Sequence, residues 1–249
     1  MHKLVLLFAL AALAASPALA QRWEARGKEF VLSLGDEEIV YAAPGTLSAG
    51  RRGGPRVGAA LFLWHDAYVY ERLDQGTVTA GPALDARGWI AQSGTWVSRE
   101  GAPPMRYSLA LEPTEAGAML HLETEKTAPL KLTNGLWATL SLDRRGFAAG
   151  QRVWARPGAH GKIGQAVSGE CDALLVELSE GRAVSFAGEG YASVRSRVSD
   201  VTHGFEICLR PGDFPVGEKA RASLRVGFEA MPAKFPGTIE PARERLAIA

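Results

Sequence analysis

Apolar and polar side chains alternate with a period of two along most of this chain, and this pattern constrains the fold more than any other feature. In residues 105–111 every second side chain is apolar, with Arg106 and Ser108 between them. Successive side chains of a strand point to opposite faces, so this alternation predicts strands with one apolar and one polar face. The same pattern recurs in residues 118–125, 174–179, 205–210 and 221–228.

One-sided strands of this kind suit antiparallel sheets that bury one face and leave the other wet. Many short strands separated by glycine and proline turns predict stacked sheets instead of a helix-flanked parallel sheet. We therefore expect an all-β chain, a large antiparallel β-sandwich of jelly-roll or supersandwich-like form with little helix. Residues 113–117 read as the turn of a hairpin. Residues 44–56 hold four glycines and three arginines and predict a long mobile loop.

The first twenty residues have the pattern of a secretory signal. Lys3 gives a basic start, the next twelve residues are apolar, and Ala18 and Ala20 supply small side chains for cleavage. Twelve residues of helix cover roughly 18 Å, too little to span a bilayer. A buried N-terminal helix of the fold is the alternative. We expect cleavage near Ala20, export to the periplasm or the medium, a single β-sandwich domain over residues 21–236, and a C-terminal tail over residues 237–249.

The balance of charge disfavours two classes of partner. The chain has 28 Lys and Arg residues and 27 acidic residues, and Lys3 is the only charged residue in the expected leader. Nucleic acids and anionic membranes attract a basic excess, which the remainder of the chain lacks. No later segment is apolar for long enough to cross a membrane. The sequence also lacks nucleophile-elbow, zincin and phosphate-loop motifs, and we predict neither a bound metal nor a cofactor.

Two cysteines, Cys171 and Cys208, lie in the part expected to be exported. An even pair in an oxidising compartment predicts one disulfide between them. The alternative is two separate thiols.

Several aromatic residues fall on the polar side of their predicted strands. Leu61 and Leu63 share one parity, while Trp64, Asp66 and Tyr68 share the other. Large rings are costly to leave in water, at about 25 cal/mol per Å² of apolar surface. They persist there when they bind something or when another segment covers them.

Two further positions repeat this arrangement. Trp137 lies opposite an apolar row, and Trp154 shares its parity with Arg156. Flat rings beside charged groups suit sugars, whose C–H faces stack on aromatic rings while their hydroxyls accept and donate hydrogen bonds. We therefore predict ligand binding by Trp64, Asp66, Tyr68, Trp137, Trp154 and Arg156. The alternative is that both faces of the sheet are covered and that every ring belongs to a core.

His121, Glu123 and Glu125 share one parity of a single strand. Neighbours on one face of a strand lie roughly 6.5–7 Å apart at the backbone. That spacing lets two carboxylates reach the separation of about 5–5.5 Å used by retaining glycosidases. A histidine with two carboxylates also suits a metal ion. The three residues are weak catalytic candidates, and a solvent-facing strand explains them equally well.

These observations favour a secreted or periplasmic carbohydrate-binding or accessory protein, with a poly- or oligosaccharide as its partner. Two alternatives remain open. One is a glycan-active enzyme, a hydrolase or lyase that uses carboxylates on a sheet face. The other is a structural or protein-interaction module of the envelope.

Overall fold

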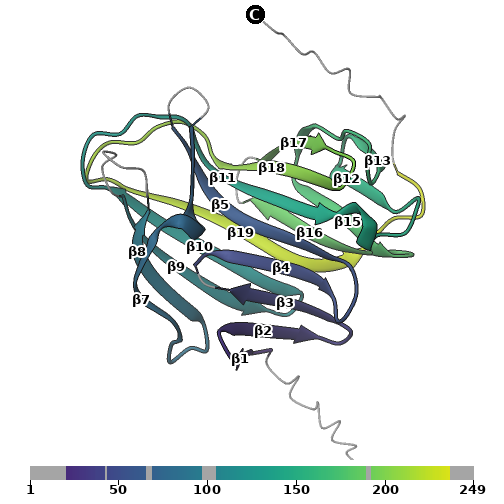
Figure 1. Ribbon diagram of the computed structural model, residues 1–249, viewed down its shortest axis with the longest axis horizontal. Coiled ribbons are helices and arrows are strands. Elements are labelled where there is room, and N and C mark those ends of the chain that lie inside the picture. Colours follow the sequence, from purple (N-terminus) through teal and green to yellow (C-terminus); the bar gives the residue numbers. More distant parts are fainter. Residues whose placement is uncertain (1–20, 43, 66–68, 97–104, 189–191, 236–249) are drawn as a thin grey trace, which may run out of the picture.

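The computed structural model describes residues 21–42, 44–65, 69–96, 105–188 and 192–235, which form two large antiparallel sheets. The ten-stranded sheet has the order β1-β2-β3-β4-β5-β11-β18-β17-β14, with β6 paired to β5. The nine-stranded sheet has the order β13-β12-β15-β16-β19-β10-β9-β8-β7. The two sheets lie one over the other as layers (Figure 1). The predicted all-β sandwich is confirmed.

The strands of the ten-stranded sheet are β1 (Trp23–Arg26), β2 (Glu29–Leu34), β3 (Glu37–Ala42), β4 (Thr46–Arg51), β5 (Arg56–His65), β6 (Val69–Arg72), β11 (Leu132–Asp143), β14 (Gly169–Cys171), β17 (Ala192–Val198) and β18 (Thr202–Arg210). Those of the nine-stranded sheet are β7 (Thr77–Leu84), β8 (Ile90–Trp96), β9 (Met105–Thr114), β10 (Gly117–Lys126), β12 (Arg152–Arg156), β13 (His160–Lys162), β15 (Ala173–Ser179), β16 (Arg182–Gly188) and β19 (Lys219–Ala230).

Helix is scarce in the described part of the chain. It consists there of two single turns, η1 (Leu73–Gln75) and η2 (Arg144–Gly146). Within the same residues, no helix has the length and apolar character that crossing a membrane requires.

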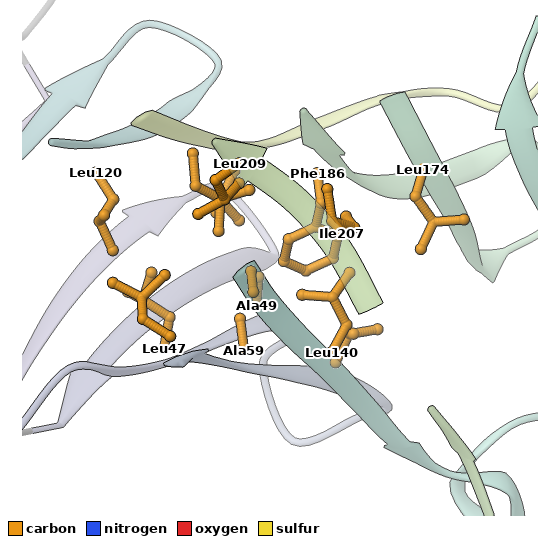
Figure 2. Packing of buried hydrophobic residues seen from close by; sticks show 14 of the residues in the cluster. Leu47, Ala49, Ala59, Leu120, Leu140, Leu174, Phe186, Ile207 and Leu209 are labelled. Carbon is orange, nitrogen blue, oxygen red and sulfur yellow. The ribbon is translucent and has the colours of Figure 1, made fainter. Parts of the chain in front are cut away.

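The core lies between the two sheets and is built from the apolar rows of their central strands. Figure 2 shows Leu47, Ala59 and Leu140 of the ten-stranded sheet facing Leu120, Phe186 and Leu174 of the nine-stranded sheet. In β9 the buried residues are the odd-numbered ones from 105 to 111, as the alternation predicts. A slip of one residue would exchange the buried and exposed rows, so the sequence pattern fixes the face that each strand buries.

The predicted hairpin is confirmed. β9 and β10 pair in register from Thr114 opposite Gly117 to Met105 opposite Lys126. Leu120 and Leu122 of β10 join the core, while His121 and Glu123 point to the outer face.

The prediction of a long loop over residues 44–56 is wrong, because β4 runs through it. Leu47 and Ala49 enter the core, and the backbone of β4 pairs with both β3 and β5. At Gly50 an added Cβ would come within 2.2 Å of the backbone oxygen of Pro55, so this glycine permits the close return of the chain. Gly50 therefore serves tight packing of backbone in this segment.

The prediction of a disulfide is also wrong, because Cys171 and Cys208 are both free thiols. Both belong to the ten-stranded sheet, with β17 between their strands. Cys171 points into the core between the sheets, whereas Cys208 packs with Phe62 and Trp64 on the opposite face. Side chains on opposite faces of one sheet cannot reach the short separation that an S–S bond needs.

A network of hydrogen-bonded side chains crosses the interior between the two sheets. The Tyr41 hydroxyl, from β3, donates to Oε1 of Gln92 at 2.5 Å, and it accepts from the backbone N–H of Gly45. Nε2 of Gln92, in β8, donates to the Tyr107 hydroxyl of β9 at 2.6 Å. Burial raises the pKa of the Tyr41 hydroxyl well above its usual value. Each buried polar atom has a partner, so this network links the sheets without an unsatisfied group.

The two thiols give a direct check on the free state of the cysteines. Burial raises the pKa of each thiol to about 11, so neither forms the reactive thiolate in the folded protein. A thiol reagent added without reductant should react slowly with the native chain and should count two thiols per chain in denaturant. If the reagent counts no thiols in denaturant, the two cysteines form a disulfide and the assignment of two free thiols is wrong.

Gln92→Leu should lower the free energy of unfolding by about 1–3 kcal/mol, because it leaves buried tyrosine hydroxyls without their partner. Denaturant unfolding measures the loss. Adding Tyr41→Phe and Tyr107→Phe to Gln92→Leu removes the orphaned hydroxyls and should recover part of the stability. Unchanged stability of Gln92→Leu would show that the network is not formed.

Candidate functional site

An open hollow lies on the outer face of the nine-stranded sheet, with a cavity volume of about 890 Å³. Its floor is made by the outward rows of four adjacent strands, β8, β9, β10 and β19. Most of the outward side chains there are small, which leaves room above the backbone. The outward floor residues are Ala91, Ser93, Ser108, Ala110, His121, Glu123, Arg221 and Ser223.

β7 and the turn after it form one wall of this groove. The wall residues are Ala80, Gly81, Ala83, Arg87 and Trp89. The pairing of β7 with β8 shifts register twice between Val78 and Ala83, so the edge strand is bulged. Gly81 has φ +78°, and an added Cβ would come within 2.3 Å of the backbone oxygen of Ala91. Only glycine allows this approach, so the bent wall depends on that residue.

His121 lies in the groove with two partners. Its Nε2 is 3.1 Å from Oε2 of Glu112, which lies on the outward row of β9. The imidazole stacks on the indole of Trp89, with ring centroids 5.8 Å apart and planes 16° from parallel. Hydrogen bonding and stacking together orient a histidine that the groove leaves open to a ligand.

The Trp89 ring is held from a second direction by Arg87. The guanidinium carbon of Arg87 lies 3.9 Å from the centroid of the Trp89 ring, a cation–π arrangement. Asp85 accepts hydrogen bonds from Nε and Nη2 of Arg87 and from the backbone N–H of Trp89. The β7–β8 turn therefore fixes the guanidinium and the indole in one arrangement.

Glu123 is paired with two cations from β19. Its carboxylate accepts from Nζ of Lys219 at 2.7 Å and from Nε of Arg221 at 3.0 Å. These two hydrogen bonds hold the pKa of the Glu123 carboxyl below its usual value. Glu123 is therefore ionised at neutral pH, which favours a role as an anchor or acceptor over a role as a proton donor.

The strand alternation correctly places His121, Glu123 and Glu125 on one outer face, and the structure brings the first two into the groove. Glu125 instead lines a smaller adjoining hollow of about 160 Å³, with Arg106 and Lys219. Among the described residues, no group of three His, Cys, Asp or Glu side chains is placed to hold a metal ion. Catalysis by the three residues stays a prediction.

Trp64 and Trp137 lie on the outer face of the ten-stranded sheet, as their parity predicts, but they are not open to solvent. Their exposed fractions are only 3% and 8%. They pack against each other with Phe62 and Tyr70, and the guanidinium carbon of Arg195 lies 4.9 Å and 5.9 Å from the two indole rings. The assumption that rings opposite the core are reachable is corrected here, because the long side chain of Arg195, from β17 on the far side of β18, covers them.

Trp154 is covered by the end of the described chain. Phe235 packs on it with ring centroids 5.3 Å apart, and Met231 joins the same cluster. Arg152 fixes this segment by donating to the backbone oxygen of Pro232. The exposed fraction of Trp154 is 8%.

Among the remaining predicted ligand-binding residues, the structure describes only Arg156, and its guanidinium is already paired. Arg156 lies beside Trp154, and its guanidinium is engaged by Asp172 and Glu229 at 2.7 Å and 2.8 Å. Asp66 and Tyr68 lie outside the described residues.

Sequence reasoning missed most of the groove. Trp89 lies at the end of a turn where strand parity cannot be assigned, and Arg87 belongs to that turn. Arg221 was visible as a polar position of its strand. Nothing in the sequence, however, shows that β19 lies beside β10. The turn Asp85–Arg87–Trp89, in which an acid precedes a cation and a ring, is the one local signal that could have pointed here.

No protein-family profile and no curated protein matches this sequence. Among solved structures, the chain is similar to a galactose mutarotase-like protein from Clostridium acetobutylicum, with a TM-score of 0.55 and 7% sequence identity. The similarity covers 82% of this chain and 95% of the other. At this identity the comparison shows the fold alone, a β-sandwich.

Proposed function

We propose that this protein binds carbohydrate in the groove on the outer face of the nine-stranded sheet. The observation that carries the proposal is the open hollow in which the stacked rings of Trp89 and His121 stand beside the charged groups of Glu123 and Arg221. The likeness of the fold to a galactose mutarotase-like protein supports the same class of ligand.

The chemistry of the groove suits a sugar. Small side chains such as Ala91 and Ala110 let a flat ring approach the sheet. Hydroxyls of Ser93 and Ser108, with the charged groups, offer donors and acceptors for sugar hydroxyls. A volume of about 890 Å³ lies within the range of small-molecule sites and leaves room for more than one sugar ring.

The groove is a better site than the aromatic clusters that the sequence drew attention to. Trp64 and Trp137 are covered by Arg195, and Trp154 is covered by Phe235. A ligand at either cluster would first have to displace those contacts. At the groove Trp89 and His121 are both partly exposed, although Arg87 lies over the Trp89 ring.

One observation favours an enzyme as the second candidate function. Nε2 of His121 is hydrogen-bonded to Glu112 and faces the hollow. A histidine oriented by a carboxylate is a common general acid or base. We keep glycan turnover by His121 as the alternative to binding alone.

We also propose that the chain is exported after removal of residues 1–20. The first described strand begins at Trp23, whose side chain belongs to the core. Cleavage near Ala20 would leave every described strand intact. Mass spectrometry of the protein secreted by an expression host should find a chain that begins near Gln21. Retention of the leader on an exported chain would contradict the proposal.

Binding should depend on the groove and not on the ten-stranded sheet. Trp89→Ala and His121→Ala should each weaken binding of a soluble oligosaccharide by about tenfold, because each removes a stacking or hydrogen-bonding surface. Calorimetric titration against a panel of neutral and acidic glycans measures the affinity, and thermal unfolding checks that the variants fold.

Arg195→Ala is the matched control, because it uncovers Trp64 and Trp137 without touching the groove. It should leave the affinity unchanged. Loss of binding in Arg195→Ala with full binding in Trp89→Ala would place the site on the other sheet. Following the same mixtures by NMR separates the two candidate functions, since new sugar signals appear only if the groove also catalyses a reaction.

A further inference from the structure

We infer that the carbohydrate bound in the groove is acidic, and that carboxylates on a sugar chain are recognised by arginine and lysine side chains along the groove. This inference rests on the proposed function and names its ligand class. It follows from the sign, the position and the partners of the charges that line the hollow.

Cations outnumber anions along the groove. Arg87 and Arg221 line the main hollow, and Arg106 and Lys219 line the adjoining one, which shares Ser108 and Glu123 with it. The lining acids are Glu123 and Glu125, and two further acids, Asp85 and Glu112, lie just outside the lining, where they pair with Arg87 and His121. The excess of cations therefore belongs to the residues that face the hollows, while the whole chain carries a formal charge of only +1. An excess of one sign in a cleft raises the local concentration of ligands of the other sign.

One carboxylate orients two of these cations without neutralising both. Glu123 accepts one hydrogen bond from Lys219 and one from Arg221. The two cationic side chains remain 59% and 78% exposed. Within the described residues only Nε of Arg221 has a hydrogen-bond partner, so its two terminal nitrogens are open to a ligand. A guanidinium held in one position binds a carboxylate through two parallel hydrogen bonds.

Arg87 offers a second such group at the other side of the groove. Asp85 accepts hydrogen bonds from Nε and Nη2 of Arg87, and the guanidinium lies over the Trp89 ring. In the described part of the chain Nη1 of Arg87 has no partner, and the side chain is 60% exposed. The cation is fixed in place yet keeps a donor for an incoming anion.

The distance between these cations indicates a chain of sugars and not a single ring. Arg87 belongs to the β7–β8 turn and Arg221 to β19, with β8, β9 and β10 between them. Three strand spacings from β8 to β19 correspond to roughly 14 Å. Carboxylates on separate units of an oligosaccharide could meet both cations at once.

Oligogalacturonate chains and their methyl esters of matched length test the inference, because esterification removes the charge of the carboxyl group and adds only a methyl group. In calorimetric titrations at low salt, the acid should bind about tenfold more tightly than the ester. Added salt should weaken binding of the acid and leave binding of the ester nearly unchanged, because exposed charges are screened.

Arg221→Gln and Arg87→Gln should each remove most of the preference for the acid. Arg225→Gln is the matched control, since Arg225 is an exposed outward residue of β19 that does not line the groove. It should keep the preference, and thermal unfolding confirms that all three variants fold.

The outcomes separate this inference from the proposed function. Equal binding of acid and ester overturns the inference and leaves carbohydrate binding in place. Equal loss in Arg225→Gln and Arg221→Gln also overturns it, because general surface charge would then be responsible. Binding of neither these probes nor a neutral glycan overturns both.

Discussion

The interlocking of apolar side chains between the two sheets is the constraint on which the rest of this structure depends. The central strands of both sheets contribute one row each to the core, and the rows meet as Leu47, Leu140 and Phe186 do in Figure 2. Burial of apolar area at about 25 cal/mol per Å² makes exchange of the two faces of any central strand costly. Once the inner rows are fixed, the side chains left for function are those of the outer rows. A ligand can bind only where one of those outer rows remains open to solvent.

The outer rows differ in what covers them. On the ten-stranded sheet Arg195 lies over Trp64 and Trp137 and shields them from water. At one end of the nine-stranded sheet, Phe235 and its neighbours cover Trp154. Over β8, β9, β10 and β19 most of the outward side chains are small, and no described segment crosses them. A groove is therefore left open there. The length of the neighbouring side chains, and not the aromatic content of the strand, decides which face a ligand can reach.

Much of the fold could be predicted from the sequence, because alternation is a local property. The parity of Trp64, the hairpin of β9 and β10, and the shared face of His121 and Glu123 all follow from it. Exposure could not be predicted, because it is set by residues far along the chain, as Arg195 shows. The error at the cysteines has the same origin: spacing does not tell which face of which sheet each thiol occupies. The groove itself arises from β19 pairing with β10, which no local pattern reveals.

The central claim is that the ligand lies on the outer face of the nine-stranded sheet. A crystal structure of the protein with a bound acidic oligosaccharide tests it most directly. The account predicts sugar rings against Trp89 and His121, with a carboxylate near Arg221. Sugar bound instead beside Trp64 and Trp137, or in place of Phe235 on Trp154, with the groove empty, would contradict it.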